Sequence, residues 1–277
     1  MTLMRTEPSS MPAIHPATIA AAIEANLSAY MLSFADLPGA TAHRGGDLVW
    51  VDSGVPTAVY NAVIAAWLES ETVDARVQSV IAHFERVARP VTWHIGPTST
   101  PGDLGERLLA HGFAHSEDEP GMAASLADLD QQVVAPAGLA IDPACDETSL
   151  AEWVDVWLFP LPAEGRRLYR DALHQRALLP NAPWRYYVGR RERRPVATAE
   201  LFIDAGVASV HNVVTLPELR RQGIGEAMTR HALREARQLG ARVAVLTASP
   251  DGFSIYQRLG FREYCRFRRF EWEPAST

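Results

Sequence analysis

Apolar residues recur along the chain at two kinds of spacing, which divide it into short helices and strands. Steps of three and four residues, as at Ile19, Ile23 and Leu27, predict amphipathic helices, and short apolar runs bounded by turn residues predict strands. In the first half, helices are predicted over residues 17–34, 58–69, 74–88 and 102–111. Strands are predicted there over residues 48–51 and 91–95.

The second half alternates in the same way. Helices are predicted over residues 149–159, 163–178, 223–239 and 252–259. Strands are predicted over residues 139–141, 184–190, 195–203, 207–215, 241–246 and 261–272. An antiparallel meander followed by β-α-β-α-β predicts a mixed α/β sheet flanked by helices.

A stretch with little periodicity separates the two halves. It covers residues 131–138, contains Pro136, and is predicted to link one domain at 12–130 to a second at 139–277. Residues 1–11 are polar and are predicted to be disordered. The length of 277 residues accommodates two domains of ordinary size.

The charged residues exclude several classes of function. All 26 basic residues are arginine, so no lysine is available for a Walker-type phosphate loop, a Schiff base or a kinase mechanism. A net charge of −7 argues against a general nucleic-acid-binding protein. The two cysteines, Cys145 and Cys265, lie far apart and no HExxH motif occurs, so no metal site is predicted.

The N-terminal segment and the hydropathy pattern bear on location. No basic segment followed by an apolar core precedes the first helix, and no apolar run reaches the roughly 20 residues of a membrane span. With two free thiols, these features predict a cytoplasmic protein without a membrane partner.

One segment has the features of an anion site. Residues 213–215 end a predicted strand, and Arg220, Gly223 and Gly225 follow just before a long helix. Unpaired N–H groups and the helix dipole attract anions there, and glycines let the backbone approach a phosphate closely. A Gly-x-Gly-x-x-Gly dinucleotide fingerprint is excluded because its third position is Met228.

The remaining pattern, Arg220-x-x-Gly223-x-Gly225 after a strand, resembles the pyrophosphate-binding loop of the GCN5-related N-acetyltransferases (GNAT). A second motif supports this resemblance, since Tyr256 lies four residues before the pair Gly260-Phe261. The order of strand, glycine loop, long helix, strand, short helix and strand is also that of the family. The resemblance covers roughly residues 139–272 and implies that acetyl-CoA is the co-substrate, with no metal.

The resemblance implies roles for individual residues. The strand whose backbone pairs with the pantetheine arm is formed by Val213, Val214 and Thr215, with the Val213 amide near the thioester oxygen. The N–H groups that hold the pyrophosphate belong to Arg221, Gln222, Gly223, Ile224, Gly225 and Glu226, and Arg220 orients the loop. Tyr256 protonates or hydrogen-bonds the departing thiolate. Two further cofactor positions, where the family often has Asn and Ala, are Ser249 and Gly252.

The acceptor side is less defined. An alkylamine is protonated at neutral pH, so its attack on a thioester needs a base or a chain of waters. Glu200 and His211 are the candidate bases, the alternatives being a solvated strand residue and a core histidine. Strand alternation places Asn212 on the face opposite His211. Trp153 and Trp157, four residues apart, are candidates for the wall of the acceptor pocket, with core packing as the alternative.

The first half repeats part of the second. Residues 91–113 show the same order of strand, proline, glycine, helix and Gly-Phe as residues 243–261, with Leu108 in the place of Tyr256. No Arg/Gln-x-x-Gly-x-Gly turn occurs between residues 52 and 91. Residues 12–130 are therefore predicted to be a degenerate GNAT-like domain that lacks the cofactor loop. This domain is expected to help shape the acceptor cleft. The alternative is that the similarity arose by chance. The family's final strand is missing after Trp272, so either the sheet ends early or another segment completes it.

These observations predict two tandem GNAT-like units, of which the second, at 139–277, is catalytic. The predicted activity is direct transfer of an acetyl group from acetyl-CoA to the amine of a small molecule by a monomer or homodimer. The alternatives are a non-catalytic acyl-CoA-binding sensor, or an enzyme that acetylates a peptide N-terminus or a hydroxyl.

Overall fold

The computed structural model describes residues 16–37, 39–129, 135–177, 182–204 and 206–275. The segment expected to be disordered, 1–11, and the first part of the expected linker, 131–134, lie outside the described residues.

The first half begins with a helix and contains five strands. Its elements are α1 (Pro16–Leu32), the 3-10 turn η1 (Ser33–Asp36), β1 (Thr41–Arg44), β2 (Leu48–Asp52), β3 (Ala62–Ala66), α2 (Val73–Arg86), β4 (Val91–Ile95), α3 (Leu104–Ala110) and β5 (Ala114–Ser125).

The second half repeats this order after one additional strand. Its elements are β6 (Leu139–Pro143), α4 (Glu147–Trp157), α5 (Ala163–Ala177), β7 (Trp184–Arg191), β8 (Arg194–Asp204), β9 (Val207–Thr215), the 3-10 turn η2 (Pro217–Leu219), α6 (Ile224–Gln238), β10 (Val243–Thr247), α7 (Pro250–Arg258) and β11 (Arg262–Trp272). In both halves, three strands therefore lead into helix, strand, helix and strand.

All described strands form one sheet, and the two halves exchange a strand within it. The order is β1-β2-β3-β4-β11-β5-β10-β9-β8-β7-β6. The last strand of the first half, β5, pairs with β10, and the last strand of the second half, β11, pairs with β4. The two exchanged strands also pair with each other, antiparallel, at the centre. The segment that completes the sheet of the second half is therefore β5, which answers the question left by the missing final strand.

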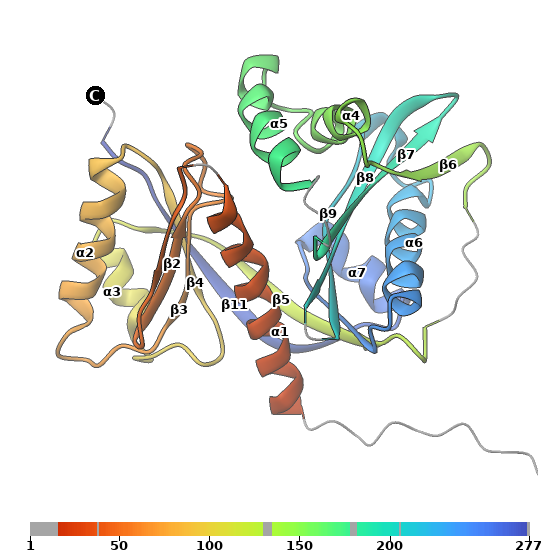
Figure 1. The fold of residues 1–277 in the computed structure, drawn as a ribbon. Helices are drawn as coiled ribbons and strands as arrows, with labels where there is room; N and C mark the ends of the chain where they lie inside the picture. Colours follow the sequence, from red (N-terminus) through yellow and green to blue (C-terminus); the bar gives the residue numbers. More distant parts are fainter. Residues whose placement is uncertain (1–15, 38, 130–134, 178–181, 205, 276–277) are drawn as a thin grey trace, which may run out of the picture.

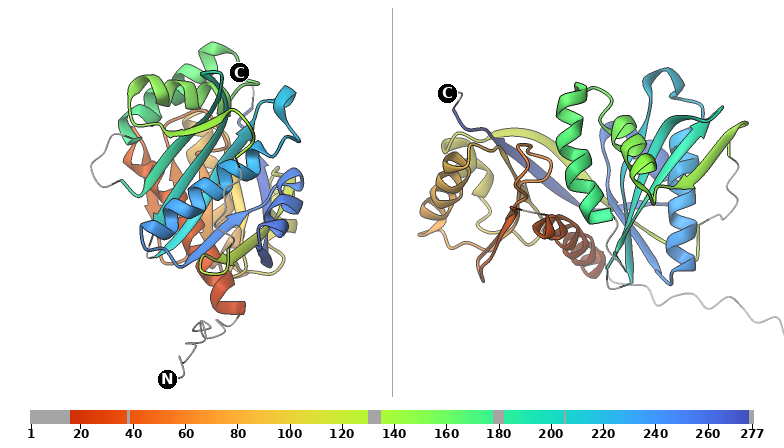
Figure 2. Two further views of the ribbon diagram at one scale, coloured as in Figure 1. Left: turned by 90° about the vertical axis from the view of Figure 1, so that its right-hand side faces the viewer. Right: turned by 45° about the horizontal axis from the view of Figure 1, so that its top comes forward.

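The sheet bends so that its two ends form the arms of a V (Figure 1). Helices α1, α4 and α5 lie inside the V, whereas α2 and α3 cover the outer face of one arm and α6 and α7 the outer face of the other. The second view of Figure 2 shows α1 between the two arms. The inner core joins both halves, with Tyr30 and Phe34 of the first packed among Trp153, Trp184 and Tyr186 of the second.

One element was predicted wrongly. The helix expected over residues 58–69 contains strand β3 at Ala62–Ala66 instead, and each of these five residues is buried. A short, continuous apolar run does not distinguish a buried strand from a buried helix by its spacing. The chain turns into β3 at Asn61, whose side-chain amide accepts from the backbone N–H of Ser53 at 2.9 Å and donates to Pro90 O at 3.0 Å.

Candidate functional site

The candidate site begins where two parallel strands of the second half separate. β9 and β10 are paired only from Val207 to Ser209 and from Val243 to Val245. β9 then continues to Thr215 without a further pairing to β10 among the described residues. This separation leaves the edge of residues 213–215 that faces away from β8 open to a ligand, apart from Thr215 O.

The segment after β9 folds as the motif predicts. Arg221 and Gly223 both have a left-handed backbone, with φ values of 60° and 77°, and Gly223 is the N-cap of α6. Left-handed turns of this kind direct successive N–H groups to one side and form a concave anion site. The first N–H groups of α6 have no acceptor within the helix, so they face the same space. The Arg220 guanidinium donates to Thr215 O at 3.2 Å, which ties the loop to the end of β9.

A cavity of about 770 Å³ lies between this loop and α7. It brings together nearly all residues for which the motif implied contact with acetyl-CoA. Those lining it are Val213, Val214, Thr215, Arg220, Arg221, Gly223, Ile224, Gly225, Glu226, Ser249, Gly252 and Tyr256. The exception is Gln222, whose side chain accepts a hydrogen bond from Arg191 at 2.6 Å outside the cavity.

Gly225 keeps part of this cavity open. A Cβ at this position would meet Thr215 Oγ1 at 3.6 Å and Val213 Cγ1 at 3.9 Å, which are ordinary contacts. The protein itself therefore tolerates a side chain there, and the glycine serves the open space in front of the loop rather than the packing of the chain. Room of this kind suits the close approach of a diphosphate to main-chain N–H groups.

Tyr256 forms the other side of the cavity. Burial raises the pKa of its hydroxyl to about 12, so the phenol carries its proton at neutral pH and can donate it. Its ring lies against Gly252, where a Cβ would come within 2.7 Å of Cε2. Ser249 caps α7 by accepting from the Gly252 N–H at 3.3 Å. The glycine that stands where the family often has alanine therefore provides the space for the ring of Tyr256.

Glu200 lies inside the V rather than in this cavity. It is 1% exposed, and its Oε2 accepts from Asn212 at 2.7 Å and from the Tyr30 hydroxyl at 3.1 Å. The Arg176 guanidinium approaches Oε1 at 3.5 Å. Burial raises the pKa of Glu200, and the charge of Arg176 with the donated hydrogen bonds opposes that rise. Glu200 is therefore a buried acid within a polar network, not a solvated strand residue.

Asn212 corrects one prediction. It faces the same side as His211, because it donates to Glu200 and, at 3.4 Å, to the Tyr30 hydroxyl, while the His211 ring stacks on Tyr30 at 3.7 Å. The cause is an irregularity in β9: Asn212 has φ of 51°, and the β8–β9 register shifts between the pairs at Thr198 and Glu200. A bulge cancels the alternation of side chains that a regular strand imposes.

His211 is held in its neutral form. Burial, assisted by the positive charge of Arg176, lowers the pKa of His211 from 6.5 to about 3. One ring nitrogen, Nε2, lies 2.8 Å from Ser209 Oγ. A histidine with this pKa accepts a proton weakly, so of the two candidate bases Glu200 is the stronger.

Two residues of this network were not predicted from the sequence. Arg176 is completely buried, lies between Trp184 and Phe34 at 3.9 and 4.3 Å from their ring centres, and donates to the Tyr186 hydroxyl at 3.1 Å. Tyr30 comes from α1 of the other half. An arginine in a strongly basic helix and a tyrosine on an apolar helical face have no distinguishing spacing, so no pattern in the sequence marks them.

The two candidate tryptophans occupy different environments. Trp153 is fully buried and donates to Ala199 O at 3.1 Å, so a ligand would reach it only after other side chains moved. Trp157 is partly exposed and packs against Tyr60 and Tyr169. Core packing therefore explains the position of Trp153. Part of the Trp157 side chain remains exposed inside the V.

At the corresponding place in the first half, the chain itself bridges the two strands. β3 and β4 also run parallel and are paired only from Ala62 to Val63 and from Thr92 to Trp93. Beyond this pairing, Thr100 bonds to β3 and to the residues after it, donating to Ala66 O at 2.9 Å and accepting from Leu68 N at 3.2 Å. The turn that follows β3 contains Glu69 and Glu71, whose charges repel a phosphate.

Comparison with known proteins agrees with this geometry. Residues 147–261 match the model of the acetyltransferase (GNAT) family. No curated protein matches the sequence. A GCN5-related N-acetyltransferase from Kribbella flavida shares the fold with a TM-score of 0.72 and 22% identity, covering 93% of this chain and 96% of that one.

Two further solved structures cover nearly the whole chain. A GCN5-related N-acetyltransferase from Sphaerobacter thermophilus aligns with a TM-score of 0.57 and 18% identity over 94% of both chains. A tandem GNAT protein from the clavulanic acid biosynthesis pathway aligns with a TM-score of 0.60 and 14% identity, over 96% of this chain and 98% of that one.

Residues 147–261 thus match the GNAT family of acetyltransferases. The chain as a whole has the α/β fold of a tandem GNAT protein. Within the part of the chain that the structure describes, no group of three or more His, Cys, Asp or Glu side chains could hold a metal ion. No described helix is long and apolar enough to span a membrane.

Proposed function

We propose that the protein transfers an acetyl group from acetyl-CoA, bound in the second half, directly to the amine of a small molecule. The observation that carries the proposal is the cavity at the separation of β9 and β10, which combines a concave N–H site, an open position at Gly225 and the hydroxyl of Tyr256. At the separation of β3 and β4, the backbone of Thr100 instead bonds to Ala66 and Leu68, and the turn that follows β3 contains Glu69 and Glu71.

The described residues fit the parts of acetyl-CoA in order. The N–H groups from Arg221 to Glu226 would hold the pyrophosphate, assisted by the α6 dipole. The free backbone of residues 213–215 would pair with the pantetheine amides, and the Val213 N–H would polarise the thioester carbonyl. Acetyl-CoA supplies an acetyl group already activated as a thioester.

Tyr256 completes the transfer step. As the amine nitrogen bonds to the carbonyl carbon, the bond to sulfur breaks and its electron pair leaves with the sulfur. Tyr256, which is protonated at neutral pH, hydrogen-bonds that sulfur or donates its hydrogen to it. The proton lost by the amine would pass to Glu200, whose raised pKa makes it a better base than an ordinary carboxylate. Because Glu200 is 1% exposed, that proton would travel through the Tyr30 hydroxyl or a water.

The first half supports a small acceptor. α1 lies inside the V opposite α4 and α5, and Tyr30 covers His211 on the face of β9 from which an acceptor would approach (Figure 1). Aromatic side chains from both halves pack together there, as Tyr60 does against Trp157. An acceptor site between two halves of one chain would suit a metabolite better than an extended peptide.

The direct test is an acetylation assay. Purified protein is incubated with acetyl-CoA and a panel of primary amines, with a peptide carrying a free N-terminus and with a matched alcohol, and the released CoA thiol is measured. Turnover with one class of small amine supports the proposal. Turnover only with the peptide or the alcohol would favour that alternative acceptor, and binding of acetyl-CoA without turnover on any acceptor would favour a sensor.

A Tyr256→Phe substitution tests the transfer step. Loss of one proton donor to the departing sulfur is expected to lower kcat about 100-fold while acetyl-CoA affinity changes less than threefold, since general acid catalysis contributes roughly 10²–10⁴. Tyr264→Phe on β11 serves as the control and should match wild type. A kcat within threefold of wild type in the Tyr256 variant would remove the assigned role.

A further inference from the structure

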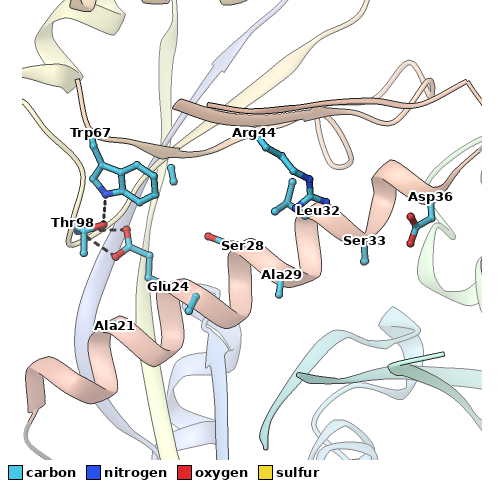
Figure 3. Close-up of a pocket in the computed structure, with 12 residues that line it drawn as sticks. Ala21, Glu24, Ser28, Ala29, Leu32, Ser33, Asp36, Arg44, Trp67 and Thr98 are labelled. Atoms are coloured by element: carbon cyan, nitrogen blue, oxygen red, sulfur yellow. Dashed lines mark hydrogen bonds between the residues drawn. The ribbon is translucent and has the colours of Figure 1, made fainter. Parts of the chain in front are cut away.

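A second cavity lies in the first half, between α1 and the strands of the N-terminal arm (Figure 3). Its volume is about 630 Å³, and it follows about three turns of α1. Its walls are mostly apolar. The apolar residues that line it are Ala21, Ala25, Ala29, Leu32, Ala65 and Trp67. None of the residues assigned to acetyl-CoA or to the acceptor lines this cavity.

One end of the cavity contains a buried carboxylate. Glu24 is 6% exposed, and both of its oxygens accept from the Thr98 N–H, at 3.3 and 3.4 Å, while the Thr98 side chain gives a further hydrogen bond. The two bonds from the N–H are long, and a carboxylate can accept about four. The carboxylate lies against the backbone of Gly96, where a Cβ would come within 2.2 Å of Oε1. The chain therefore leaves space for Glu24 but supplies hydrogen bonds from one residue, Thr98, and no ion pair among the described residues.

No cation of the described residues pairs with Glu24. Of the cationic side chains, only Arg44 lines the cavity, and it lies on the opposite wall, near Leu32 rather than near Glu24 (Figure 3). Burial raises the pKa of Glu24, as expected for a carboxyl group without a counter-ion. A buried carboxylate is stabilised mainly by a paired cation with good hydrogen bonds. An ammonium group would therefore supply the ion pair that the Glu24 carboxylate lacks.

The neighbourhood of Glu24 also suits an organic cation. The Trp67 indole is 43% exposed, and its Nε1 donates to Thr98 Oγ1 at 3.1 Å, which fixes the ring beside the carboxylate (Figure 3). An indole face attracts ammonium groups. Along α1 from Glu24, the exposed alanines Ala21 and Ala25 offer a floor on which a hydrocarbon chain can lie.

We propose that this cavity is a second ligand site, which binds a primary alkylammonium through Glu24 and Trp67 with the alkyl chain along α1. The carboxylate receives the ammonium hydrogens, the indole covers the charge, and the alanines of α1 contact the alkyl carbons. The site lies in the half that lacks the cofactor loop, so it binds without transferring a group. It stands independently of the acetyltransferase function proposed above.

Calorimetric titration with hexylammonium chloride tests the site in the absence of acetyl-CoA, with hexanol and hexanoate as probes of equal length. We expect hexylammonium to bind at least tenfold more tightly than either. Glu24→Gln should abolish this preference. Ala25→Leu, which places a larger side chain in the cavity, should lower the affinity for hexylammonium at least tenfold. Asp36→Asn removes an equal charge from the exposed far end of the cavity and should change affinity less than threefold.

Two measurements distinguish binding at this cavity from binding at the active site. If hexylammonium is acetylated, Glu24→Gln should retain that turnover at saturating amine while losing the binding measured without acetyl-CoA. Equal affinity for hexylammonium and hexanol, or unchanged binding in Glu24→Gln, would overturn the proposal. Absence of binding at 10 mM hexylammonium would overturn it as well, whether or not acetyl transfer is observed.

Discussion

The two arms of the sheet start from the same topology and differ at the point where two parallel strands separate. In the second half the gap between β9 and β10 opens into a cavity of about 770 Å³. In the first half the gap between β3 and β4 is bridged by Thr100, whose backbone bonds occupy the groups that an incoming ligand would use. The difference shows how one arm can lose a ligand site without losing its fold.

The loops at the two gaps differ in charge as well. The turn before α6 contains Arg220, Arg221 and Gly223, whereas the turn before α2 contains Glu69 and Glu71. At the N-terminus of α2, Arg76 is paired with Asp47 at 2.7 Å. An anion is attracted to the first turn and repelled from the second. We infer that the first half is a degenerate unit that does not bind acetyl-CoA and that completes the fold of the second half.

That contribution is large, because neither half completes its own sheet. The exchanged strands β5 and β11 pair with each other over most of their length and each fills a place in the other arm. The largest expected effect therefore comes from separating the halves. Residues 1–130 and 135–277, produced as two chains, should each lack a cooperative unfolding transition by circular dichroism, and mixing them during refolding should restore it.

A matched control is the full chain cut at a protease site inserted at residues 131–134. The cut chain should unfold like the intact protein, because the exchanged strands still hold the halves together. A cooperative transition in either half alone would contradict the shared sheet.

The next effect tests the core that the halves share. Arg176→Met leaves Glu200 buried without its charged partner, which typically costs about 3–5 kcal/mol of unfolding free energy. Adding Glu200→Gln removes the unpaired charge and should recover part of the loss. Arg170→Met on the same helix breaks only an exposed pair with Asp155 and should cost less than about 1 kcal/mol in urea unfolding. Equal losses for the two arginines would contradict the role of Arg176.

A further effect, which is small near neutral pH, concerns one histidine in each half. Burial lowers the pKa of both His94 and His211 from 6.5 to about 3. Below pH 6.5 the unfolded chain therefore binds protons on these histidines that the folded chain does not bind. The stability that the two neutral histidines contribute is complete above pH 6.5 and is lost as the pH falls toward 3. Each histidine contributes up to about 1.4 kcal/mol per pH unit in that window, less for the partly exposed His211.

Urea unfolding between pH 4 and 7 measures this contribution. His94→Gln and His211→Gln should each flatten the dependence of stability on pH, whereas Thr92→Ser, also buried on β4, should only shift it. An unchanged slope in both histidine variants would show that neither is held neutral in the folded chain.

More of the second half than of the first could be predicted from the sequence. The loop from Arg220 to Gly225 and the position of Tyr256 were predicted because a left-handed turn, a helix N-terminus and a buried ring each require particular residues. The strand exchange could not be predicted, because pairing between β5 and β11 joins segments some 150 residues apart. The bulge at Asn212 was missed for a related reason. It depends on the register of β9 against β8, which the local pattern of residues does not reveal.

The polar network inside the V was only partly predictable. Glu200 and His211 stand out as ionisable groups on apolar strands, but their partners Arg176 and Tyr30 come from other elements and from the other half. Their importance follows from burial, which only the assembled fold creates.

The central claim is that acetyl-CoA binds in one half of the chain through its main-chain loop. Calorimetric titration measures this most directly, with wild type and two alanine variants. We predict one site per chain, weakened at least tenfold (about 1.4 kcal/mol) by Gly223→Ala, because the left-handed φ of 77° at Gly223 shapes the N–H loop and disfavours any residue with a Cβ. Gly112→Ala, with a similar φ of 86° and open space around it in the first half, should leave affinity unchanged. Two sites per chain, no binding at millimolar acetyl-CoA, or equal affinity in the Gly223 variant would contradict it.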